Sequence, residues 1–148
     1  MIKKVLIPLF LLGIIIGCKK ASSSIGKGVP DTYVYFTANV NYGQYDSLQH
    51  IGGWAYVANA GYDGIILFRS SSTTILAFDR GCPYDCASNI KAIDTFQTTG
   101  ITARCPVCGT TYTLYGGGTV ASGPGTLALR QYYTSYYHPI LTVSSNPL

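Results

Sequence analysis

Four cysteines in the second half of the chain form two pairs whose spacing suits a metal site. The first pair, Cys82 and Cys86, lies in the segment Cys-Pro-Tyr-Asp-Cys, and the second, Cys105 and Cys108, lies in Cys-Pro-Val-Cys-Gly. A proline after the first thiol and a glycine after the last favour a tight loop whose backbone N–H groups point at sulfur, which stabilises thiolates and a metal bound to them. Four thiolates suit tetrahedral Zn²⁺ and iron equally well.

Disulfides are the alternative use of these four cysteines. An exported protein meets an oxidising compartment, and disulfide pairing leaves an even number of cysteines. Closing so short a loop within either pair, however, gains little chain entropy and strains the bond. The spacing therefore favours a metal, and it leaves disulfides within or between the pairs open.

The fifth cysteine, Cys18, follows a segment typical of a secretory signal. Lys3 and Lys4 precede an uncharged apolar run that ends at Ile16, and this run is shorter than the roughly 18 to 20 residues that span a bilayer. We predict that residues 1–17 are a signal peptide. The sequence around Gly17-Cys18 resembles the lipobox of bacterial lipoproteins, which implies a lipid on Cys18 and a protein anchored to a membrane of the bacterial cell envelope, at its periplasmic or outer-membrane face.

Residues 18–30 have the composition of a flexible tether, and residues 31–148 provide enough chain for one domain. The tether and signal carry half of the ten cations, so the formal net charge of +4 does not describe the domain. From Asp31 onward, five cations face six aspartates. A nucleic-acid partner is not expected, because phosphate binding requires a clustered basic surface.

The segments around the cysteine pairs have the composition of β-strands. Apolar or β-branched runs alternate with glycine- and asparagine-rich turns, and no stretch has helical periodicity, which predicts an all-β antiparallel sandwich or barrel. Each cysteine pair directly follows a predicted strand, so two loops leaving rigid elements can face one another. The predicted strands cover residues 32–41, 54–57, 64–68, 74–80, 101–104, 111–115, 126–133 and 140–143.

The two cysteine segments resemble the cluster-binding boxes of Rieske iron-sulfur domains, which read Cys-x-His and Cys-x-x-His-Gly-Ser-x-Tyr. The matching segments here are Arg80-Gly81-Cys82-Pro83-Tyr84 and Cys105-Pro106-Val107-Cys108-Gly109-Thr110-Thr111-Tyr112. The strand before the first box and the proline loop and return strand after the second also match, so the similarity extends from about Gly52 to Val143. It implies a Rieske-like antiparallel β domain with a two-loop metal-binding subdomain.

The sequence departs from the Rieske pattern at both histidines. Cys82 and Cys105 match the two thiolate ligands, but Tyr84 stands at the first histidine position and Cys108 at the second. The usual set of two histidines and two cysteines is therefore impossible. The protein's two histidines, His50 and His138, lie outside both boxes and are not expected to bind metal.

Other positions of the resemblance complete the expected site. Cys86 lies near the position at which many Rieske domains have a cysteine that forms a disulfide. The position of that cysteine's disulfide partner is occupied here by Val107, so Cys86 is free to act as the fourth ligand. Thr110 and Tyr112 match the hydroxyl donors that tune the cluster, and Pro124 matches the proline loop.

The Rieske resemblance implies a non-enzymatic protein that carries one electron on a 2Fe-2S cluster, to and from a redox partner protein, and the lipobox-like segment implies that it is anchored to a membrane. The expected cluster ligands are Cys82, Cys86, Cys105 and Cys108. A binding or structural module whose four cysteines hold Zn²⁺ or form disulfides is the alternative. Hydrolysis has no support, because no nucleophile elbow such as Gly-x-Ser-x-Gly occurs.

Overall fold

The computed structural model describes residues 28–86, 94–95 and 101–148. The predicted signal peptide, Cys18 and the tether up to residue 27 lie outside the described residues. Within these ranges no helix is long and apolar enough to cross a membrane.

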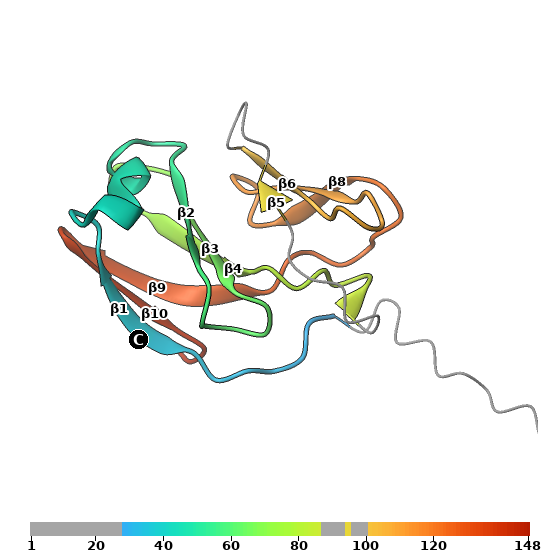
Figure 1. Ribbon diagram of the computed structural model, residues 1–148, viewed down its shortest axis with the longest axis horizontal. Coiled ribbons are helices and arrows are strands. Elements are labelled where there is room, and N and C mark those ends of the chain that lie inside the picture. The colour runs from blue at the N-terminus through green and yellow to red at the C-terminus, as the bar shows by residue number, and fades with distance from the viewer. Residues whose placement is uncertain (1–27, 87–93, 96–100) are drawn as a thin grey trace, which may run out of the picture.

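The described chain folds into two antiparallel β-sheets, which confirms the predicted all-β fold (Figure 1). The larger sheet has six strands in the order β1-β10-β9-β4-β3-β2, and the smaller has four in the order β5-β6-β7-β8. The strands are β1 (Tyr35–Asn39), β2 (Trp54–Val57), β3 (Ile65–Arg69), β4 (Ile75–Asp79), β5 (Asp94–Thr95), β6 (Thr102–Arg104), β7 (Thr111–Thr113), β8 (Thr119–Ser122), β9 (Gln131–Tyr137) and β10 (Ile140–Ser144).

Strands β3 and β4 of the larger sheet are buried on both faces. In β3, Ile65 and Leu67 point into one hydrophobic core, whereas Ile66 and Phe68 point into a second. This division follows from the two-residue period of a strand, and it explains why β3 reads as a continuous apolar run rather than an alternating one. The first core lies inside the curled larger sheet, and the second lies between that sheet and the smaller one.

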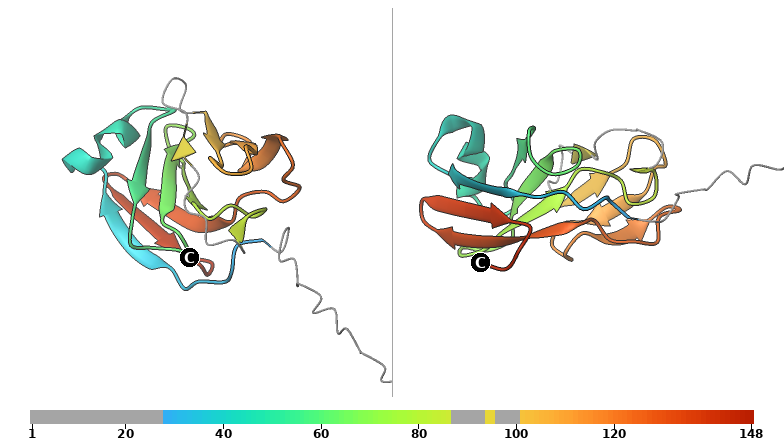
Figure 2. Two further views of the ribbon diagram at one scale, coloured as in Figure 1. Left: turned by 45° about the vertical axis from the view of Figure 1, so that its right-hand side comes forward. Right: turned by 90° about the horizontal axis from the view of Figure 1, so that it is seen from below.

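The second core includes Cys82 and Cys105, and Cys108 packs against it. Cys82 and Cys105 are almost fully buried, and they pack in the same cluster as Phe68 of β3, Phe78 of β4 and Leu114. The smaller sheet therefore packs against the larger one through the second core, which contains Cys82 and Cys105. Figure 2 shows this attachment from two further directions.

Four elements differ from the strands expected from the sequence, and one of them is the short strand β5, which no predicted strand covers. A 3-10 helix, η1 (Gly43–Gln49), follows β1 and buries Tyr45 and Leu48, which lie three residues apart and so share one side of a three-residue turn. Two apolar residues are too few to produce a helical pattern in the sequence. The glycine run at residues 116–118 lies in a hairpin that leads into β8, a strand that the sequence did not predict. The strand expected to begin at residue 126 begins only at Gln131.

Candidate metal centre

The first cysteine loop leaves the end of β4 and is held there by the buried carboxylate of Asp79. Its Oδ1 accepts hydrogen bonds from the backbone N–H of Gly81 at 2.7 Å and of Asp63 at 3.3 Å. Its Oδ2 accepts from the backbone N–H of Tyr62 at 2.6 Å and from the hydroxyl of Tyr132 at 2.7 Å. Because Asp79 is fully buried, these four bonds fix the direction in which the chain enters the loop.

The second cysteine loop is a tight connection between β6 and β7. Cys105 donates its N–H to the carbonyl of Thr110 at 2.9 Å, and Gly109 donates its N–H to the carbonyl of Cys105 at 3.0 Å. Gly109 has φ +76°, a conformation that glycine adopts without strain and that turns the chain back into β7. This hairpin directs Cys105 and Cys108 toward the first loop.

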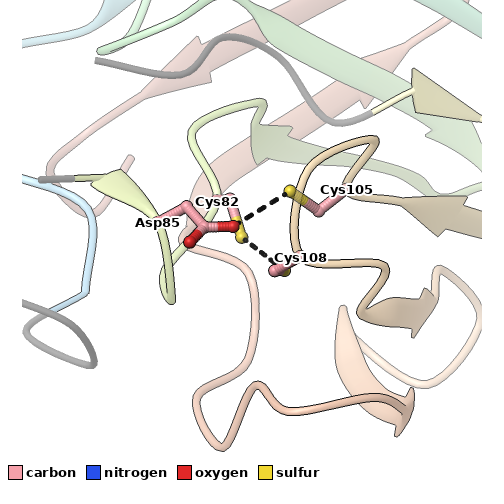
Figure 3. A group of neighbouring side chains, drawn as sticks. All are labelled: Cys82, Asp85, Cys105 and Cys108. Carbon is pink, nitrogen blue, oxygen red and sulfur yellow. Dashed lines mark hydrogen bonds between the residues drawn. The ribbon is translucent and has the colours of Figure 1, made fainter. Parts of the chain in front are cut away.

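The two loops bring three cysteines and one aspartate together (Figure 3). One ligand atom from each of Cys82, Asp85, Cys105 and Cys108 lies within 4.8 Å of all the others. The Sγ atoms of Cys82 and Cys108 are 3.7 Å apart, and the Cys105 thiol donates to Oδ2 of Asp85 at 3.5 Å. Cys82 and Cys105 are buried, whereas Asp85 and Cys108 are partly exposed at the rim. These four donors can hold a metal ion.

All four cysteines in the described residues are free thiols. The sulfur separation of 3.7 Å between Cys82 and Cys108 is far beyond the roughly 2.05 Å of a disulfide bond. This separation is compatible with two ligands of one metal site, and none of these cysteines is at bonding distance from another.

Two hydroxyl groups contact the sulfurs, at the positions expected from the sequence. The hydroxyl of Tyr112 lies 3.6 Å from Sγ of Cys82, and Oγ1 of Thr110 lies 3.1 Å from Sγ of Cys108. The Cys108 thiol donates to Thr110, and once this thiol is deprotonated the hydroxyl donates to sulfur instead. Gly125 donates its N–H to Oγ1 of Thr110 at 3.0 Å, which leaves the hydroxyl proton available for that bond.

The proline loop, residues 123–126, packs against Thr110. Pro124 itself is exposed. The close contact is made by Gly123, where an added Cβ would lie 2.6 Å from Cα of Thr110. A glycine at this position is therefore required for the loop to reach the metal site.

The surroundings shift the pKa values of two of the grouped thiols. Burial raises the pKa of Cys105, and hydrogen bonds from the backbone N–H groups of Cys108 and Val107 to its sulfur oppose that rise. Burial also raises the pKa of Cys108, opposed by the hydrogen bond with Thr110. In the absence of metal both thiols are therefore protonated at neutral pH, and metal binding must displace these protons.

Cys86, the predicted fourth ligand, is not one of the four grouped residues. Its sulfur lies on the side of Gly81, where an added Cβ would approach it to 3.3 Å. Burial raises the pKa of Cys86 to about 12, and the carboxylate of Asp79 adds to this shift. At neutral pH Cys86 is a buried thiol. His50 and His138, both exposed, also lie outside the group, and Nδ1 of His138 is hydrogen-bonded to the hydroxyl of Tyr136 at 3.0 Å.

Asp85 is not among the metal ligands predicted from the sequence, because that prediction considered the spacing of cysteines and not of carboxylates. Cys82 and Asp85 are separated by two residues, as are Cys105 and Cys108, and each pair begins with Cys-Pro. A search for any ligand residue at the spacing of the second loop would have found Asp85 in the first loop.

We expect Asp79→Asn to destabilise the domain by about 2 to 4 kcal/mol. Both carboxylate oxygens accept hydrogen bonds, so the amide nitrogen of asparagine would face a donor in either orientation. Urea unfolding measures the change as a lower transition midpoint. Asp31→Asn is the matched control, because the Asp31 side chain is 95% exposed and its pair with Arg130 contributes little. An Asp79→Asn midpoint equal to that of Asp31→Asn would contradict the positioning role of Asp79.

No protein-family model and no curated protein matches this sequence. The chemistry of the site therefore follows from its own donors and their surroundings, and these form a cluster of three cysteines and one aspartate able to bind a metal.

Proposed function

We propose that the chain is a Rieske-like electron carrier, anchored by lipid to a membrane of the bacterial cell envelope. In this proposal Cys82, Cys105 and Cys108, with a fourth ligand from the first loop, hold a 2Fe-2S cluster. The cluster would supply a site that accepts and releases one electron. The protein would act on no substrate of its own, and its partners would be a one-electron donor and a one-electron acceptor protein.

The observation that carries this proposal is the contact of hydroxyls with ligand sulfurs. Tyr112 lies 3.6 Å from the sulfur of Cys82, and Thr110 lies 3.1 Å from that of Cys108. Hydrogen bonds to ligand sulfurs stabilise the more negative, reduced state of an iron-sulfur centre and so tune its potential. In a redox centre such contacts set the potential, in addition to stabilising the thiolate ligands.

The protein's own residues provide the remaining requirements of such a centre. Cys82 and Cys105 are 1% and 2% exposed, so the cluster side that faces the second core is shielded from water. Cys108 and Asp85 lie at the rim, where an electron can pass to a docked partner. The first loop begins at the end of β4, and the second connects β6 to β7. These strands limit how far the loops can rearrange when the charge of the cluster changes.

A single metal ion is the second candidate, and the compactness of the donors favours it. In a tetrahedral site with metal–sulfur bonds of about 2.3 Å, two ligand sulfurs lie roughly 3.8 Å apart. The Cys82 and Cys108 sulfurs are 3.7 Å apart. The Rieske resemblance assigns these two positions to different irons, whose ligands spread further apart. A lone Zn²⁺ at this site would fasten the two loops together as a structural staple.

Iron, zinc and acid-labile sulfide analysis of the purified protein, together with its visible spectrum, distinguishes the two candidates. Two irons and two sulfides per chain, with a coloured protein, would support the electron carrier. One zinc per chain, with no sulfide and no colour, would support the structural staple and overturn the electron carrier.

The membrane anchor is supported by the sequence around Cys18 and by the position of the tether. Arg130 donates hydrogen bonds to the carbonyls of Val29 and Pro30 and forms an ion pair with Asp31. These first described residues run beside the loop that carries Cys82 (Figures 1 and 2). The ten residues from Cys18 to residue 27 reach at most about 35 Å. The metal centre would therefore be held close to the membrane surface.

We expect Cys18→Ser to move the protein from the membrane fraction to the soluble fraction of the envelope. Without the thiol no lipid can be attached, and the acyl chains supply the membrane affinity at about 0.8 kcal/mol per buried CH₂. Fractionation followed by immunoblotting measures this change, with Cys86→Ser as a cysteine control that keeps the lipid. A Cys18→Ser protein as firmly bound as the parent would show that the anchor lies elsewhere.

A further inference from the structure

The two metal loops are built alike. The first reads Cys82-Pro83-Tyr84-Asp85 and the second reads Cys105-Pro106-Val107-Cys108. In both, a cysteine, a proline and one further residue precede a residue that can bind metal. Under this alignment Asp85 takes the place of Cys108, and Cys86 takes the place of Gly109.

The backbone hydrogen bonds of the two loops follow the same alignment. Cys86 donates its N–H to the carbonyl of Cys82 at 2.9 Å, and Gly109 donates its N–H to the carbonyl of Cys105 at 3.0 Å. In each loop, the residue whose N–H closes the turn comes directly after the residue that can bind metal, which is Asp85 in the first loop and Cys108 in the second. Cys86 therefore closes the first turn, as Gly109 closes the second.

The turn of the first loop also determines which side chain faces the second loop. Asp85 donates its N–H to the carbonyl of Cys82 at 3.2 Å, which is the hydrogen bond of a 3-10 turn. Side chains three residues apart in such a turn lie one above the other. The side chain of Asp85 thus stacks with that of Cys82, whereas that of Cys86 is rotated by about a third of a turn.

The side-chain positions agree with the backbone. Oδ2 of Asp85 lies 3.5 Å from Sγ of Cys105, and Figure 3 shows this carboxylate pointing at the three sulfurs. The sulfur of Cys86 instead lies against Gly81, next to Tyr62, whose hydroxyl donates to the Cys86 carbonyl at 3.4 Å. Asp85 and Cys86 thus face different sides of the first loop.

We propose that Asp85 is the fourth ligand of the metal centre, through a carboxylate oxygen, and that Cys86 is not a ligand. This inference rests on the metal binding of the proposed function but not on electron transfer. Three thiolates and one carboxylate carry the same formal charge as four thiolates. They form a less soft donor set, however, and the carboxylate at the exposed rim is the ligand that exchanges most readily.

Cobalt titration of the metal-free protein tests the assignment, because each thiolate bound to Co²⁺ adds to a sulfur-to-metal charge-transfer band. We expect the parent and Cys86→Ser to show the same band and affinity, with three thiolates each. Asp85→Cys should bind Co²⁺ with a band about one third stronger, since a fourth thiolate joins the set. Asp85→Ala should keep the three-thiolate band and bind at least about tenfold more weakly.

Two results would overturn the assignment. A weaker band and lower affinity in Cys86→Ser, with Asp85→Ala unchanged, would make Cys86 the ligand. A parent protein that takes up no Co²⁺ would remove the metal centre altogether. A protein that binds Co²⁺ as expected but assembles no iron-sulfur cluster would instead leave Asp85 as the ligand and contradict only the electron-transfer proposal.

Discussion

Replacing Cys105 by serine is expected to lower the metal affinity of the protein by about 100-fold or more. Structural zinc sites bind with apparent free energies of about 10 to 16 kcal/mol, so one ligand in four accounts for roughly 3 kcal/mol. Cys105 is buried, and its sulfur lies beside the carboxylate of Asp85 and receives two backbone N–H groups. A serine hydroxyl binds zinc and iron poorly, so the metal site would lack one of its four ligands.

Metal content after purification, measured by mass spectrometry of the elements, checks this expectation. Cys82→Ser and Cys108→Ser should lose metal to a similar extent. His50→Ala and His138→Ala are the controls and should keep the parent content, because both histidines are exposed and lie outside the group. Full metal content in Cys105→Ser would contradict the assignment of the centre to these loops.

The cysteine variants should remain folded, because the larger sheet has its own core. That core contains Val34, Ile65, Leu67, Leu141 and Val143, and no cysteine belongs to it. A far-ultraviolet circular dichroism spectrum like that of the parent would show that loss of metal does not reflect global unfolding.

The sequence predicts the strands of this fold better than it predicts the centre. Strands β3 and β4 lie almost where the apolar runs indicate, because a buried strand needs apolar side chains on at least one face. Strand β8 was missed because three of its four residues are exposed or polar and only its pairing with β7 defines it. A short strand with mostly exposed residues leaves no apolar pattern in the sequence.

The same limit applies to the ligands. Cys82, Cys105 and Cys108 could be predicted because thiols at short spacing suggest a metal at once. Asp85 has no such signal, since an aspartate in a loop is far more often a solvated turn residue. Its place among the grouped donors follows only from the turn of the first loop, which sets its carboxylate against Cys105. Side-chain direction within a turn, rather than residue type, separates Asp85 from Cys86.

If the centre is a 2Fe-2S cluster, its reduction potential should lie well below the usual Rieske range. Two neutral imidazoles on one iron give Rieske centres potentials of about −150 to +300 mV, whereas plant-type centres with four thiolates lie near −400 mV. No histidine of the described chain belongs to the ligand group here. Thiolates and a carboxylate are anionic, so they make the cluster more negative and disfavour the reduced state. The hydroxyls of Tyr112 and Thr110 raise the potential again, but by less than the change of ligand charge lowers it.

The potential should also be nearly independent of pH between about pH 6 and 9, because no ligating imidazole is left to lose a proton. Burial, together with the hydrogen bond to Cys82, raises the pKa of Tyr112, so this phenol stays protonated and keeps its contact with sulfur over the whole interval. Protein-film voltammetry across this range measures both properties, and Tyr112→Phe should shift the potential to a more negative value at every pH. A positive potential that falls steeply as the pH rises would mean that His50 or His138 ligates iron. A protein that is purified with zinc and shows no redox wave would instead favour the structural staple.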